Sequence, residues 1–228
     1  MSDPLDNPIW HSLIGAHAHL AQGAGRARRY PAEVSPFVGL SDDTDDYAWR
    51  DLAGLLGPAE SVAVAADPRR VPADWGRVMS LAGVQMTATP GLIGAPDDEA
   101  MTLGAADVEE MLDLVARTEP GPFGPQTYRM GRYLGIRRGG ALIAMAGERL
   151  RPPGWTEITA VCTDPAFRGQ GLAARLLNAV CAGIVQRGER PLLHVLASNG
   201  SAIALYERLG FVVRRSVQFE VIHAPVTR

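Results

Sequence analysis

The sequence contains no lysine, only two cysteines and no apolar run near the roughly 18 residues that a membrane-spanning helix needs. All 22 basic residues are therefore arginines. Without lysine the chain cannot carry the nucleoside-triphosphate loop, whose pattern ends in Gly-Lys followed by Ser or Thr. Cys162 and Cys181 form no Cys-x-x-Cys pair, which argues against a disulfide framework. The first residues also lack a basic segment followed by an apolar stretch, so we expect a cytoplasmic protein with no membrane contact.

A strong charge of either sign is missing as well. The formal net charge is −3 and the arginines are spread along the chain, so no broad basic field is present to attract nucleic acid. The short runs Arg26–Arg29 and Arg214–Arg215 are expected to be solvated faces. Nucleic acid is therefore not an expected partner.

The acidic run Asp42–Asp46 is the one segment that suggests a cation. It lacks the Asp-x-Asp-x-Asp-Gly order and the later bidentate Glu of an EF-hand loop. Short acidic side chains just before an apolar periodic segment are typical of a helix N-terminus. We therefore predict no metal site here and expect the run to cap a helix over 47–56.

Helix and strand signals alternate over residues 1–95. The expected helices cover 8–14, 47–56 and 72–86, and the expected strands cover 35–40 and 61–66. Glycines, prolines and an acidic pair follow between 90 and 98, so we place a domain boundary there. Residues 1–95 are thus predicted to form an N-terminal α/β region.

The pattern becomes more regular from residue 102 to 228. Three strands over 133–137, 141–150 and 155–163, joined by glycine and proline turns, predict an antiparallel meander. Helices are expected over 105–117, 172–187 and 201–209, and strands over 191–197 and 211–223.

A glycine-bearing turn, Thr163–Ala173, joins the third strand to the helix at 172. Such a turn gathers unpaired N–H groups at a positive dipole end, which suits a phosphate. Gly169–Ala174 also matches the Gly-x-Gly-x-x-Ala spacing of dinucleotide-binding folds, but the next strand ends in Leu196-Ala197-Ser198, without the acid that would bind the ribose. A plain tight connection between strand and helix is a further alternative.

Two signatures bear on this choice. Arg168–Ala173 resembles the Arg/Gln-x-x-Gly-x-Gly/Ala acyl-coenzyme A signature of the GNAT superfamily of N-acetyltransferases, and Ala160–Pro165 resembles the strand and proline that precede it. Asn199–Phe211 resembles the second signature, Asn-x-x-Ala-x-x-Leu-Tyr-x-x-x-Gly-Phe. The resemblance covers about residues 102–228 and is nearest to the glycine N-acyltransferase-like branch.

This resemblance implies an α/β fold with a mixed, mostly antiparallel central sheet flanked by helices, and residues 1–95 are a candidate for a degenerate half of similar fold. It implies acetyl-CoA as cosubstrate and a strand that splays from its neighbour at a bulge, where main-chain groups pair with pantetheine. The implied coenzyme-binding residues are Val161, Cys162, Thr163, Arg168, Gly169, Gln170, Gly171, Leu172, Ala173, Asn199 and Tyr206.

For the chemistry, Tyr206 matches the general acid of the family, which returns a proton to the departing thiolate. Glu157 resembles the strand carboxylate that some relatives use as a base, and simple alternation places it on the face of Val161 and Thr163. His194 in the next strand is a second candidate base. A covalent route through Cys162 is disfavoured, because no His neighbours it in sequence.

We therefore expect an N-acetyltransferase that moves an acetyl or other short acyl group from coenzyme A to an amine by direct attack. The acceptor is a small molecule or a peptide, and the protein is a monomer or a homodimer. The alternative is a coenzyme A-binding sensor or scaffold with vestigial transfer activity.

Overall fold

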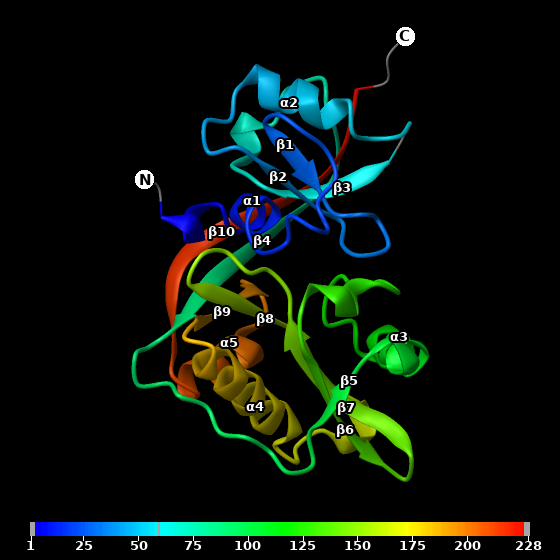
Figure 1. Cartoon of the computed structure of the whole chain (residues 1–228), viewed down its shortest axis with the longest axis vertical. Helices are drawn as coiled ribbons and strands as arrows, with labels where there is room; N and C mark the ends of the chain where they lie inside the picture. Colours follow the sequence, from blue (N-terminus) through cyan, green and yellow to red (C-terminus); the bar gives the residue numbers. More distant parts are fainter. Residues whose placement is uncertain (1–2, 59, 226–228) are drawn as a thin grey trace.

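The structure is a computed structural model that describes residues 3–58 and 60–225, and within them the strands form one continuous sheet. Its order is β1-β2-β3-β10-β4-β9-β8-β7-β6-β5 (Figure 1). Most neighbours are antiparallel, whereas the β2–β3 and β8–β9 pairs are parallel. The strands are β1 (Ala27–Arg29), β2 (Phe37–Leu40), β3 (Ser61–Ala65), β4 (Gly76–Ala88), β5 (Met101–Leu103), β6 (Tyr133–Arg138), β7 (Ala141–Glu148), β8 (Trp155–Thr163), β9 (Arg190–Leu196) and β10 (Phe211–His223).

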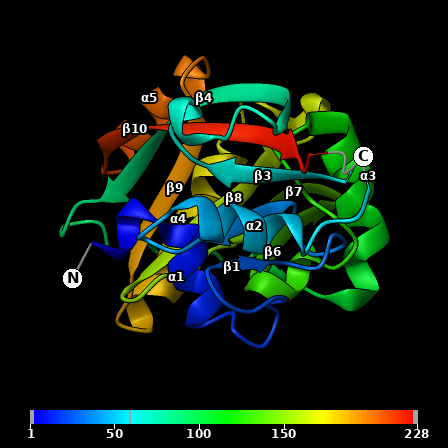
Figure 2. The same ribbon diagram turned by 90° about the horizontal axis from the view of Figure 1, so that it is seen from above.

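Five α-helices lie in the part of the chain that the structure describes: α1 (Pro8–Ile14), α2 (Asp46–Ala53), α3 (Val108–Thr118), α4 (Leu172–Gln186) and α5 (Gly200–Arg208). None of these described helices is long and apolar enough to cross a membrane. The predicted helix of the acidic run is confirmed as α2, because the Asp45 carboxylate accepts hydrogen bonds from the backbone N–H groups of Tyr47 and Ala48 at 3.0 and 3.1 Å. In Figure 2, α1 and α2 lie against the N-terminal strands.

The long strands β4 and β10 join the two parts of the chain. β10 pairs with β3 over Phe219–His223 and with β4 along its whole length, and β4 pairs with β9 on its other edge. Figure 1 shows both strands running from the N-terminal elements to the C-terminal ones. One sheet thus joins strands from both sides of the domain boundary that we predicted at 90–98. The division into two domains stays a prediction.

The helix predicted over 72–86 is wrong, because this segment forms β4. Val78, Leu81 and Val84 recur at intervals of three, a spacing that imitates a helical face. Gly76 and Gly83 weaken a helix, and pairing with β10 and β9 on its two edges satisfies the backbone of the segment. Tertiary pairing therefore overrides the local pattern.

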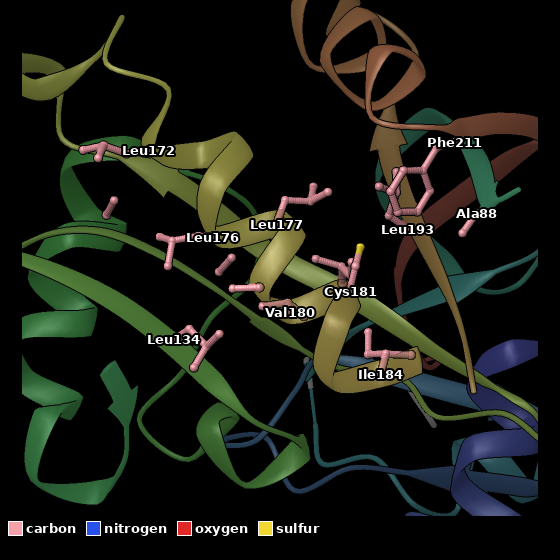
Figure 3. Close-up of a cluster of buried hydrophobic side chains, with 14 of the residues drawn as sticks. Ala88, Leu134, Leu172, Leu176, Leu177, Val180, Cys181, Ile184, Leu193 and Phe211 are labelled. Carbon is pink, nitrogen blue, oxygen red and sulfur yellow. The ribbon is translucent and has the colours of Figure 1, made fainter. Parts of the chain in front are cut away.

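Two helices bury opposite faces of the C-terminal strands. Successive residues of one strand go to different clusters: Ile143 packs with the apolar side chains of α4, and Leu142 packs with those of α3. Figure 3 shows the α4 stripe facing the sheet, with labelled side chains Leu172, Leu176, Leu177, Val180, Cys181 and Ile184. Burial of this stripe fixes the N-terminus of α4 against the end of β8.

Candidate active site

A cavity of about 900 Å³ opens where β8 and β9 part. The two parallel strands pair from Trp155↔Arg190 to Ile158↔Leu193 and no further, although both continue beyond that point. His194 is the first β9 residue after the last pair and lines the cavity. Unpaired main-chain groups of β8 are thereby left beside the opening.

A bulge in β8 produces the separation. Thr159 pairs with Gly147 and Cys162 with Met145, so β8 has one residue more than β7 between these pairs. Ala160, inside this stretch, has φ +51°, a left-handed conformation that is uncommon for a residue with a Cβ. The splayed, bulged strand that the resemblance implied is confirmed.

The same bulge overturns the predicted face of Glu157. The extra residue shifts the alternation, so Glu157 shares a face with Thr159 and Cys162, while Val161 and Thr163 point to the other side. Glu157 is fully buried and lines a second cavity, of about 600 Å³, rather than the first. Simple alternation failed because it assumes a regular strand.

The glycine turn forms an open cradle at the N-terminus of α4. Gly169 and Gly171 have φ values of +79° and +75°, which glycine adopts without strain. A Cβ built at either position would meet no atom within 4 Å, so the space beside both is open. Gly171 is the N-cap of α4 and provides no side-chain cap, which leaves the first N–H groups of the helix facing the opening.

The predicted coenzyme-binding residues gather around this cradle. Arg168, Gly169, Gly171, Leu172 and Ala173 line the cavity, whereas Gln170 is exposed outside the lining. The chain enters the cradle through a short 3-10 turn, Pro165–Phe167, which the Asp164 carboxylate caps. The open space and the uncapped helix end suit a pyrophosphate.

α5 supplies the opposite wall. The Asn199 side chain accepts a hydrogen bond from the backbone N–H of Ala202 at 3.1 Å, so Asn199 caps the helix while lining the cavity. Tyr206 also lines the cavity, and its ring lies 6.2 Å from that of Phe211. Burial raises the pKa of Tyr206 to about 12, which keeps its hydroxyl protonated and able to donate.

Glu157 lies in a buried network with Arg149 and His194. Arg149 donates to the carboxylate of Glu157 from Nε at 3.0 Å and from Nη2 at 2.7 Å, and His194 Nδ1 lies 2.7 Å from Oε1. Burial alone would raise the pKa of Glu157, but the charge of Arg149 and the hydrogen bonds from Arg149 and His194 hold it below its usual range. Glu157 is thus an anion whose oxygens are already engaged.

The hydrogen bonds of the Gln85 amide determine which tautomer His194 adopts. The Gln85 carbonyl oxygen accepts from Arg214 at 3.0 Å, so its amide N–H groups donate to the backbone oxygen of Leu5 at 2.9 Å and toward His194 Nε2 at 3.1 Å. Nε2 therefore accepts, and Nδ1–H donates to Glu157. Sequence reasoning missed Gln85, which lay in the wrongly predicted helix, and Arg149, which no motif marks.

Both cysteines are free and buried. Burial raises the pKa of the Cys162 thiol, so at neutral pH the reactive thiolate is suppressed. This environment suits a packing residue and not a nucleophile.

Comparison with known proteins places this site in a family. Residues 133–219 match the family described as FR47-like protein. A protein assigned to the GNAT family of acetyltransferases in Novosphingobium aromaticivorans is similar in structure, with a TM-score of 0.90 and 40% identity, over 98% of this chain and 99% of that one. The N-alpha-acetyltransferase RimI of Mycobacterium tuberculosis is 34% identical over 129 residues, which is 50% of this chain and 80% of that protein. The chain belongs to the GNAT superfamily of N-acetyltransferases.

Further GNAT relatives agree with this assignment. The [ribosomal protein bS18]-alanine N-acetyltransferase of Escherichia coli is 46% identical over 52 residues, or 22% of this chain and 35% of that enzyme. The predicted GNAT fold class and the prediction of a GNAT-type N-acetyltransferase are confirmed. These relatives are named as acetyltransferases and lend no support to the sensor or scaffold alternative. Likeness to the glycine N-acyltransferase-like branch stays a prediction.

Proposed function

We propose that this protein transfers an acetyl group from acetyl-CoA to a primary amine by direct attack, within one ternary complex. The observation that carries the proposal is the parting of β8 and β9, which brings the glycine cradle, Tyr206 and His194 around one cavity. Acetyl-CoA supplies the activated acyl group. We also propose a cytoplasmic location.

The chain's own groups divide the binding work. The backbone N–H groups at Gly169–Ala173 hold the pyrophosphate, with the dipole of α4 and the charge of Arg168 adding attraction. Main-chain groups of Val161 and Thr163, released from pairing with β9, hold the pantetheine arm and orient the thioester carbonyl.

Proton transfer falls to two side chains. His194 Nε2 takes a proton from the attacking amine, in the place where the Gln85 amide now donates, and Glu157 holds the imidazole in the required tautomer. The amine nitrogen forms the new C–N bond as the C–S bond breaks. Tyr206 donates its hydroxyl proton toward the departing sulfur. We thus assign the base role to His194 and a positioning role to Glu157.

The test is release of free coenzyme A thiol from acetyl-CoA with a panel of primary amines, beside calorimetric binding of acetyl-CoA alone. Amine-dependent release with saturable acetyl-CoA binding supports the proposal. Tight acetyl-CoA binding without release for any amine overturns it in favour of the sensor alternative. The names of the relatives add an α-amino group of a protein, such as an N-terminal alanine, as a second acceptor class for the panel.

A further inference from the structure

The coenzyme cavity continues past His194 into a chamber that the N-terminal part of the chain helps to build. Five apolar side chains line it, from β2, β3, β4 and β10: Phe37, Ala63, Leu81, Phe219 and Val221. We call this set the apolar chamber. The strand β4 contributes Leu81 to the chamber, and β10 contributes Phe219 and Val221. Both strands span the N-terminal and C-terminal parts of the sheet (Figure 1).

The chamber is aromatic at the end that meets His194. The Phe219 ring centroid lies 5.6 Å from that of His194 at an interplanar angle of 86°, and 5.8 Å from that of Phe37. Phe37 and Ala63 are only 6% and 8% exposed, so the deep wall is enclosed by protein. A group whose nitrogen reaches His194 therefore places its body against apolar, largely water-excluded surface.

Charge in the chamber limits the occupant further. Among the described residues that line this cavity, the one carboxylate is Glu119, at the C-terminal end of α3. The buried Arg149 guanidinium is bound by Glu157 and stacks 4.7 Å from the Phe37 ring centroid. The side chains of the apolar chamber carry no charge themselves, so a second cation packed against them would be buried without a partner, which is costly.

From this geometry we infer that the acceptor is a compact primary amine with one positive charge, carried on an apolar and preferably aromatic body. Its nitrogen lies at His194 and its body packs on Phe37, Phe219 and Leu81. This inference rests on the proposed function, because it names the substrate class of the same site. It differs from the protein α-amino group that the relatives' names suggest.

The experiment compares four probes: 2-phenylethylamine, ethanolamine, putrescine and a short peptide that begins with alanine. With acetyl-CoA saturating, kcat/KM for 2-phenylethylamine is expected to exceed that of each other probe by about tenfold or more, since burial of a phenyl group accounts for such a factor. Equal or better turnover of ethanolamine, putrescine or the peptide overturns the inference.

Two matched variants locate the effect. Leu81→Gln should raise KM for 2-phenylethylamine about tenfold and leave the dissociation constant of acetyl-CoA unchanged. Met79→Gln, two residues away on the same strand and 51% exposed outside the cavity, should behave as wild type. Equal KM values for the two variants overturn the inference.

Calorimetry with the coenzyme A-loaded protein separates failure of the inference from failure of the proposed function. Tighter binding of 2-phenylethylamine than of the other probes supports the apolar chamber even where no thiol is released, a result that counts against transfer alone. Binding of 2-phenylethylamine no tighter than that of ethanolamine overturns the inference even where transfer occurs.

Discussion

Glu157 Oε1 lies 2.7 Å from His194 Nδ1, beside the last paired residues of the parallel strands β8 and β9. The carboxylate is fully buried and ionised, and the imidazole points its other nitrogen toward Gln85. The pair thus joins a buried anion to a histidine that lines the cavity. Sequence order separates the two residues, and only the parallel pairing of their strands brings them together.

If His194 is the base, His194→Ala should lower kcat by about a hundredfold or more, because a positioned base contributes at least that factor. The dissociation constant of acetyl-CoA should stay the same, since the glycine cradle is untouched. Stopped-flow turnover and calorimetry measure the two quantities. Unchanged kcat would remove His194 from the mechanism.

Tyr206→Phe should lower kcat by about tenfold or more with little change in acetyl-CoA affinity, because the change deletes only the donating hydroxyl. The ring contact with Phe211 is kept, so the fold of α5 should persist. Circular dichroism provides the folding control. Wild-type turnover in this variant would show that the proton comes from elsewhere.

Gly171→Ala should weaken acetyl-CoA binding by about tenfold or more, because it adds a methyl group to the open cradle. Gly188→Ala is a matched control: Gly188 also has a positive φ, +78°, and open space around its Cβ position, but lies beyond the far end of α4. Both variants should lose similar stability, on the order of 1 kcal/mol, from backbone strain. If both bind acetyl-CoA equally well, the cradle is not the pyrophosphate site.

Cys162→Ala should retain most of the activity, and initial-rate plots against both substrates should intersect, as direct attack requires. The buried thiol has a raised pKa and so is a poor nucleophile. Parallel lines together with a stable acetyl-enzyme would instead show a ping-pong route.

The N-terminal part should show an acid-sensitive ion pair. Hydrogen bonds from Arg29 lower the pKa of Glu60 from 4.5 to about 2. The unfolded chain therefore takes up this proton at higher pH than the folded chain, so the stabilisation is complete above about pH 4.5 and is lost as the pH falls toward 2. Urea unfolding of wild type and Glu60→Gln across this range should show their difference in free energy shrinking as pH falls. A constant difference would contradict the assignment.

Local patterns were sufficient for most of the C-terminal elements, but not for the short edge strand β5 (Met101–Leu103). The hairpin at Gly139–Gly140, the strand Trp155–Thr163 and the amphipathic α4 follow from turn chemistry and apolar periodicity, which act between near neighbours. The two signatures pointed to the cradle and to α5 for the same reason, since each is a short contiguous segment.

The sequence by itself determined the glycine cradle, the position of Tyr206 on its helix and the family, because these depend on residue types at fixed short spacings. Only the tertiary structure decided that 76–88 is a strand, that Glu157 faces away from Val161, and that Gln85 and Arg149 complete the network of His194. Each of these depends on strand pairing between distant segments, where one inserted residue changes which face a side chain occupies. The same long-range pairing, of β10 with β3 and β4, builds the apolar chamber beside the glycine cradle.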